Sequence, residues 1–143
     1  DENPYTFSIQ GTGGDPAAEI EVSGNGVPIL TGDDEPDTSD DTDFGDADVA
    51  AGLVTHTFTI TNSGSLDLNL SGSPIVVIGG THAADFILTT DATTPVSSGG
   101  GTVTFQISFN PSDAGQREAT ITVSSDDADE GTYTFSIQGN GTN

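Results

Sequence analysis

The sequence contains no cysteine, tryptophan, methionine or lysine, and Arg117 is its single strongly basic residue. Without cysteine the chain can form no disulfide and has no thiol to serve as nucleophile or metal ligand. Apolar residues make up 31% of the chain. No apolar run approaches the roughly 20 residues that a membrane-spanning helix requires. We therefore expect neither disulfide or thiol chemistry nor membrane insertion.

The charge of the chain is almost entirely of one sign. Its 23 acidic residues against one arginine give a formal net charge of -22. Nucleic acids are excluded as partners, because phosphate binding needs clustered lysine and arginine. Anionic membrane surfaces are excluded by the same repulsion. Such a chain repels itself unless salt screens it or cations neutralise it. The composition therefore indicates a saline setting, bound divalent cations, or both.

Alternation of apolar and polar residues predicts an all-β fold. A period of two is typical of half-buried strands. It is clearest in four segments: 55–61 (THTFTIT), 102–109 (TVTFQISF), 118–124 (EATITVS) and 132–138 (TYTFSIQ). Shorter candidate strands are 18–23, 27–30, 66–70, 75–78 and 85–89. We expect NSGS at 62–65 to join two strands as a tight hairpin. The strands predict an immunoglobulin-like antiparallel β-sandwich of about seven to nine strands.

One segment, 32–48, does not resemble a strand of a sandwich core. Between Asp33 and Asp48 nine of sixteen residues are acidic, and Phe44 is the single bulky apolar residue. We predict a solvated acidic loop. Ca²⁺ takes six to eight oxygen ligands, largely from carboxylates and carbonyls. The loop offers short, closely spaced carboxylates for such a site: Asp33, Asp34, Asp37, Asp40, Asp41 and Asp43. The alternative is a solvated loop without metal.

A second group of carboxylates crowds the turn SSDDADEG at 124–131. Its members are Asp126, Asp127, Asp129 and Glu130. A linker carboxylate, Asp15 or Glu19, could share a Ca²⁺ with this turn and stiffen the junction between units. The alternative is again a solvated turn, because Asp is favoured in tight turns for local backbone bonding.

The two ends of the chain carry the same stretch. Residues 1–13 and 129–141 match at ten of thirteen positions with an offset of 128. The first account is a tandem array with a period near 128 residues. The second is a duplicate strand that pairs with a neighbouring subunit by β-augmentation. Either way, Tyr5, Phe7 and Ile9 are predicted to face the core of another unit.

The repeat predicts a domain organisation in three parts. Residues 1–13 are the final strand of a preceding repeat or a donated strand. Residues 14–18 are a linker, and 19–143 form the sandwich, which includes the acidic loop 32–48. The partners expected from this organisation are neighbouring copies of the same repeat or subunit.

No catalytic constellation is recognisable. His56 shares a strand face with Phe58 and is predicted to be a packed edge residue, and His82 lies in a loop without a partner motif. No strand–G-x-S-x-G–helix element is present, and a chain without lysine has no P-loop. We therefore predict no catalytic residues and no enzyme activity.

Residues 43–141 resemble a known family. The strongest element is F-x-P-x-x-x-G-x-x-x-A-x-x-x-V-x-S-x-D, carried here by Phe109, Pro111, Gly115, Ala119, Val123, Ser125 and Asp127. This pattern is similar to the bacterial surface-protein repeats termed choice-of-anchor D domains, relatives of the ASPM–SPD-2–Hydin immunoglobulin-like class. The resemblance implies a β-sandwich module, repeated in long extracellular proteins, without enzymatic residues. Asp126 and Asp127 stand where the family often has Asn, which adds charge.

These observations predict a non-catalytic structural module of an extracellular bacterial surface protein or filament. It would join units end to end and be stabilised by Ca²⁺. The location expected is the cell surface or a secreted fibre. The alternative is a calcium-dependent adhesion or ligand-binding domain that uses its loops.

Overall fold

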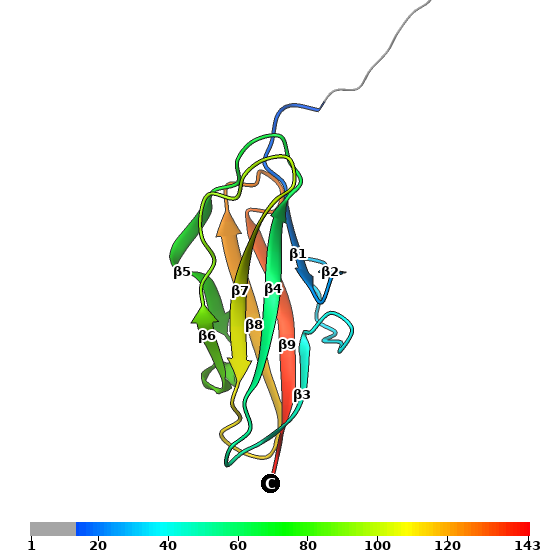
Figure 1. Cartoon of the computed structure of the whole chain (residues 1–143), viewed down its shortest axis with the longest axis vertical. Helices are drawn as coiled ribbons and strands as arrows, with labels where there is room; N and C mark the ends of the chain where they lie inside the picture. Colours follow the sequence, from blue (N-terminus) through cyan, green and yellow to red (C-terminus); the bar gives the residue numbers. More distant parts are fainter. Residues whose placement is uncertain (1–13) are drawn as a thin grey trace, which may run out of the picture.

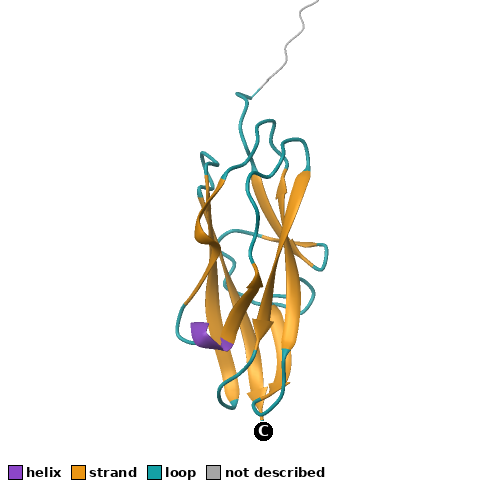
Figure 2. Cartoon of the chain, turned by 60° about the vertical axis from the view of Figure 1, so that its left-hand side comes forward, coloured by secondary structure: helices purple, strands orange, loops and turns teal. Residues whose placement is uncertain are grey.

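The strands of the computed structural model, which describes residues 14–143, form two sheets packed face to face (Figures 1 and 2). One sheet has the strand order β2-β1-β4-β7-β6 and the other β3-β9-β8-β5. The predicted β-sandwich is therefore confirmed. The repeated segment with Tyr5, Phe7 and Ile9 lies outside the described residues. The strands are β1 (Ile20–Gly24), β2 (Val27–Ile29), β3 (Asp43–Asp48), β4 (Val54–Asn62), β5 (Leu70–Gly79), β6 (Phe86–Thr90), β7 (Gly101–Phe109), β8 (Gly115–Ser125) and β9 (Thr132–Thr142).

The core lies between the sheets and is centred on phenylalanines from both. Phe58 of β4 stacks on Phe105 of β7 with ring centroids 5.3 Å apart, and Phe135 of β9 reaches Phe58 from the opposite sheet at 5.8 Å. Phe86 stacks on Phe109 at 4.9 Å. The predicted inward positions of β4, β7, β8 and β9 are buried or pack against this cluster, with His56 at its edge, so the alternation identified these strands correctly.

The end of the acidic segment, expected as loop, is a strand. β3 pairs in parallel with β9, and Phe44 and Ala47 are buried in the core. Phe44 stacks on His56 at 4.4 Å, which confirms His56 as a packed residue. The strand forms because these two apolar side chains anchor it and β9 offers an unpaired edge, while Asp46 and Asp48 face solvent. The prediction of a loop therefore holds only for the residues before Asp43, and the prediction that this loop is solvated is wrong for Asp40 and Thr42, which are buried.

The expected hairpin at 62–65 is wrong. β4 belongs to the five-stranded sheet and the next strand, β5, to the four-stranded sheet, so the chain crosses between layers here. Asn62 is fully buried, and its Nδ2 donates to the carbonyl oxygens of Leu66 and Val96 at 2.8 and 3.0 Å. These bonds hold the crossover where a two-residue turn would have reversed the chain in one sheet.

Two short strands expected at 66–70 and 75–78 are replaced by the single strand β5. Leu68 forms only an isolated bridge with Val96, and β5 begins at Leu70 and continues to Gly79. Pro74 lies within β5, which is possible because β5 is the edge of its sheet. A short 3₁₀ helix, η1 (Ala83–Asp85), precedes β6, and no helix within residues 14–143 is long and apolar enough to cross a membrane.

The described chain enters at one end of the long axis and leaves at the other (Figure 1). We call the first end the N-terminal pole; it holds residues 14–19 and the loops 62–69, 97–100 and 126–131. The opposite end is the C-terminal pole, with the loops 49–53 and 110–114 and the end of β9. The two ends of the described chain therefore lie at opposite poles of the sandwich.

Candidate functional site

A buried carboxylate, Asp127, organises the N-terminal pole. Its Oδ2 accepts the backbone N–H of Ile20 at 2.9 Å, and its Oδ1 accepts those of Asp129 and Glu130 at 3.0 and 3.1 Å. Burial alone would raise the pKa of Asp127, but these hydrogen bonds outweigh it and hold the pKa below its usual value. Asp127 is therefore an ionised group that ties the β8–β9 turn to the start of β1.

Two further carboxylates converge on Asp127. Carboxylate oxygens of Glu19, Asp127 and Glu130 all lie within 4.8 Å of one another. Repulsion by Asp127, together with desolvation and the charges of Asp129, Glu130 and Glu21, raises the pKa of Glu19. The cluster therefore concentrates negative charge at the point where the chain enters the domain, which is where a cation would be bound most favourably.

The carboxylates predicted in the 124–131 turn lie in two different environments. Asp127 and Glu130 join the cluster, and Asp129 contributes repulsion from nearby. Asp126 instead accepts the backbone N–H and the side-chain Nδ2 of Asn69 at 2.8 and 2.7 Å, which lowers its pKa. Of the two linker carboxylates considered from the sequence, Glu19 enters the cluster and Asp15 does not.

The carboxylates of the acidic loop bond mainly to their own backbone. Asp33, Asp37, Asp40 and Asp43 each accept the N–H two residues ahead, at 2.6–3.0 Å. In Asp37 the bonds from Ser39 lower the pKa. Within residues 14–143, Glu19, Asp127 and Glu130 form the one group of three carboxylates close enough to share an ion. The structure thus does not gather the six loop aspartates, which include Asp34 and Asp41, around one point.

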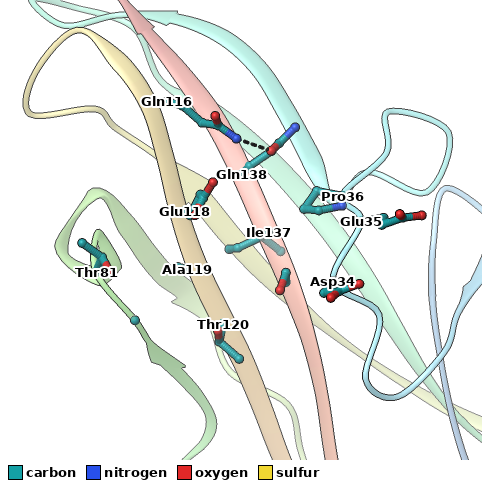
Figure 3. Close-up of a pocket in the computed structure, with 12 residues that line it drawn as sticks. Asp34, Glu35, Pro36, Thr81, Gln116, Glu118, Ala119, Thr120, Ile137 and Gln138 are labelled. Atoms are coloured by element: carbon teal, nitrogen blue, oxygen red, sulfur yellow. Dashed lines mark hydrogen bonds between the residues drawn. The ribbon is translucent and has the colours of Figure 1, made fainter.

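A polar groove of about 470 Å³ lies on the outer face of β8 and β9 (Figure 3). Gln116 donates from Nε2 to Oε1 of Gln138 at 2.8 Å across its floor. His82 Nδ1 accepts the backbone N–H of Glu118 at 3.0 Å beside it. The residues lining the groove are Asp34, Glu35, Pro36, Gly80, Thr81, Gln116, Glu118, Ala119, Thr120, Ser136, Ile137 and Gln138. Asp34 and Glu35 thus bring part of the acidic loop to the groove.

Comparison with known families identifies the sandwich. The model of a family described as "HYDIN/CFA65/VesB-like, Ig-like domain" matches residues 37–140. This match covers most of the sandwich, from the acidic loop to the end of β9. No curated protein matches the chain.

Solved structures share the architecture at low sequence identity. A protein from Porphyromonas gingivalis W83 is 14% identical with a TM-score of 0.58, covering 86% of this chain and 46% of that one. The PapD-like domain 7 of human CEP192 is 15% identical with a TM-score of 0.50, covering 99% and 98%. The secreted serine protease VesC from Vibrio cholerae is 22% identical with a TM-score of 0.53, covering 69% and 21%. The chain thus spans less than half of the Porphyromonas and Vibrio proteins, and these likenesses show the fold.

Proposed function

The chain belongs to the family of HYDIN/CFA65/VesB-like immunoglobulin-like domains, and we propose that it is a non-catalytic structural module that joins copies of itself end to end. Within that family we assign it to the choice-of-anchor D type. Its place would be a bacterial surface protein or secreted fibre. The description of the similar Vibrio protein as secreted supports an extracellular location.

The proposal rests on the residue types that fit the inward-facing positions of β9. Tyr133, Phe135 and Ile137 are buried in the core. Gly139 lies so close to Phe109 that a Cβ there would be 2.4 Å from the ring, and a Cβ at Gly141 would be 2.1 Å from the carbonyl oxygen of Asp113. β9 therefore needs three specific large residues and then two glycines.

Residues 1–13 carry the same residue as β9 at each of these inward positions. At the offset of 128 the five inward positions are occupied by Tyr5, Phe7, Ile9, Gly11 and Gly13. The three differences fall at Gly131 in the turn and at the exposed Thr132 and Asn140. The segment thus has the sequence of a complete last strand, which supports its assignment to the preceding unit of an array.

The mechanical role follows from the direction of the chain. Because the chain enters and leaves at opposite poles, successive units extend along one axis and their number sets the length (Figure 1). Along that axis β8 and β9 pair continuously from Gly115–Gly141 to Ser124–Thr132. Tension between the poles would load this ladder along its strands.

Calcium is the second part of the proposal, at the cluster of Glu19, Asp127 and Glu130. Three carboxylates supply part of the six to eight oxygens that Ca²⁺ takes, and water or a carboxylate of the preceding unit would complete the set. The ion would neutralise the repulsion that raises the pKa of Glu19. It would also fix the start of β1 to the β8–β9 turn, and so stiffen the junction.

The structural role is tested on a protein with two units, residues 1–141 followed directly by 14–143. Small-angle scattering should give a longest dimension close to twice that of the single chain. A compact particle would contradict end-to-end joining. The mass per length of native fibres then distinguishes one tandem chain from separate subunits joined by strand donation.

The calcium site is tested by thermal unfolding with Ca²⁺ and with EDTA at fixed ionic strength. We expect Ca²⁺ to raise the midpoint of the wild type, and Glu19→Gln to abolish this shift. Glu35→Gln removes the same charge away from the cluster and should retain the shift. An unchanged midpoint in the wild type would refute the calcium site and leave the structural role standing.

A ligand-binding role is the second candidate, and the polar groove over β8 and β9 favours it. Asp34, Glu35 and Glu118 would attract a cationic group of a ligand to this groove. NMR titration with a trilysine peptide at physiological salt tests the idea, with Glu118→Gln as the weakened variant. If the shifts are no larger at the groove than over the rest of the acidic surface, the groove is not a binding site.

A further inference from the structure

The chain is held firmly where it reaches the N-terminal pole. The carbonyl oxygen of Ala17 accepts the N–H groups of Ser65 and Leu66 at 2.8 and 3.2 Å, and the carbonyl oxygen of Glu19 accepts that of Ser63 at 3.1 Å. Gly64 allows this approach, since a Cβ there would lie 2.3 Å from the Ala17 oxygen. The first fixed residue is therefore Ala17, directly beside the loop that carries Leu66.

The chain is held equally firmly where it leaves the C-terminal pole. Thr142 is paired with Asp48 of β3, and its carbonyl oxygen accepts the N–H of Val49 at 2.9 Å. The loop that follows is closed by a bond from Gly52 N–H to the Asp48 carbonyl oxygen at 2.6 Å. The last fixed residue is therefore Thr142, directly beside the loop that carries Leu53.

The repeat sets the length of chain between these two fixed points. At the offset of 128, Gly14 takes the position of Thr142 in the preceding unit. Only Asp15 and Pro16 then separate it from Ala17. Three Cα–Cα steps span about 11 Å at most, and proline restricts this short link further. Two successive poles must therefore touch.

Each pole presents one exposed leucine beside the chain crossing. Leu53 is 62% exposed at the C-terminal pole and Leu66 is 51% exposed at the N-terminal pole. The other large exposed apolar residues, Val27, Leu30, Val77 and Ile87, lie in or next to strands β2, β5 and β6 along the sides. Among the large exposed apolar residues within 14–143, these two leucines are thus the ones placed beside a junction.

Ion pairs do not supply an alternative contact. Both poles are acidic, with Asp48 and Asp113 at one and Asp129 and Glu130 at the other. Arg117, the single arginine, lies 3.5 Å from Asp85 and 3.8 Å from Asp113 within its own unit. A direct ion pair with Arg117 therefore does not join the poles, which leaves apolar packing, hydrogen bonds or bound cations to hold them together.

We infer that Leu53 of one unit packs against Leu66 of the next, forming a stiff joint between the poles. The inference rests on the proposed end-to-end array. The occupant of each pole is a second copy of the same unit, because the two-residue link leaves no room for another partner. The array is then a semi-rigid rod in place of a chain of freely swivelling beads.

Disulfide trapping tests this joint without background, because the chain has no cysteine. The two-unit protein receives Leu53→Cys in its first unit and Leu66→Cys in its second. A disulfide requires Cα atoms about 4.4–6.8 Å apart. We expect it to form at least about tenfold faster than in a control with Leu30→Cys in the second unit, because the joint gives a high effective concentration. Leu30 is 73% exposed but lies on the side.

Scattering of the reduced protein distinguishes the leucine contact from the end-to-end array. Fast trapping in an extended particle supports the joint. Trapping no faster than the control, in a particle of twice the unit length, overturns the leucine contact and leaves the array intact. A compact particle overturns the array and the joint together. The single cysteine variants of the 143-residue chain should unfold at the wild-type midpoint, because both leucines are exposed.

Discussion

The hydroxyl of Tyr133 donates a 2.6 Å hydrogen bond to the carbonyl oxygen of Ile29 and so connects the two sheets of the sandwich. Tyr133 is buried on β9, and Ile29 ends the short strand β2 of the opposite sheet. Burial is the main reason why the pKa of the hydroxyl is raised, so the hydroxyl stays protonated and able to donate. The bond holds the edge strand β2 in place.

Replacing Tyr133 by Phe should therefore weaken the fold. The variant removes this hydrogen bond between the sheets, and we expect the free energy of unfolding to fall by about 1 kcal/mol. Urea denaturation measures it. Tyr5→Phe is the matched control, because Tyr5 is assigned to another unit and its loss should leave the stability unchanged. Equal losses from both variants would place Tyr5 within this domain and contradict the assignment.

The repeat can be tested by exchanging the strands. The triple variant Gly131→Asn, Thr132→Pro and Asn140→Thr gives residues 129–141 the sequence of 1–13. The changes avoid the inward positions, and proline is tolerated as the first residue of a strand. We expect the triple variant to lose less than about 1 kcal/mol of stability.

An inward change provides the contrast for this exchange. Gly139→Ala alters a position that both copies share and would place a Cβ against Phe109, so we expect a loss of more than about 2 kcal/mol. Urea denaturation compares the two variants. A triple variant as unstable as Gly139→Ala would show that residues 1–13 cannot serve as a last strand.

Arg117 should matter far more to stability than its position at the start of β8 suggests. It lies beside Asp85, whose side chain is 5% exposed and whose Oδ2 has no hydrogen-bond partner in the described structure. Arg117→Gln would leave this charge buried and unpaired, and should cost about 3 kcal/mol. Adding Asp85→Asn should recover part of the loss in urea denaturation.

The second salt-bridge partner of Arg117 supplies the control. The side chain of Asp113 is 82% exposed, and Asp113→Asn should cost less than about 1 kcal/mol. If Arg117→Gln is as mild as Asp113→Asn, the pairing with Asp85 does not stabilise the C-terminal pole.

The contribution of Asp127 should depend on pH. Its pKa is lower in the folded chain than in the unfolded one, so its stabilising effect is present above about pH 4 and is lost as the pH falls through the folded pKa. Asp127→Asn should thus lower the unfolding free energy at neutral pH by about 2 kcal/mol. The difference from the wild type should shrink below about pH 4, because a protonated Asp127 resembles Asn. A difference that is constant from pH 3 to pH 7 would refute the role of the charge, since Asp127 of the unfolded chain changes its ionisation within that range.

The sequence predicted the strands whose inward residues alternate without interruption, and missed one whose alternation is broken. In β3 the buried residues, Phe44 and Ala47, are three positions apart, because the register with β9 shifts between Asp43 and Asp46. Gly45 has a φ of 67°, which accommodates this irregularity. A period of two cannot reveal such a strand, and the surrounding aspartates masked it further.

The candidate site was predicted in part, for a similar reason. The crowded turn pointed to Asp127 and Glu130, and the repeat brought Glu19 into consideration as a linker residue. Asp127 binds the backbone of a residue 107 positions away, a contact that only the completed sandwich creates. For the acidic loop, closeness in sequence suggested a shared site. In the structure, Asp33, Asp37, Asp40 and Asp43 instead accept hydrogen bonds from separate backbone N–H groups.

Those amide contacts explain why this domain could not easily exist in a basic form. Asp33, Asp37, Asp40, Asp43, Asp48, Asp67, Asp85, Asp91, Asp113, Asp126 and Asp127 each accept at least one backbone N–H. Lysine has no acceptor atom and cannot replace them, whereas asparagine or serine can. Redesign for a different surface charge would therefore have to exchange these aspartates for neutral turn residues. Many of the acidic residues therefore stabilise turns and loops, so a change of surface charge would also change the hydrogen bonds that hold the backbone in these turns.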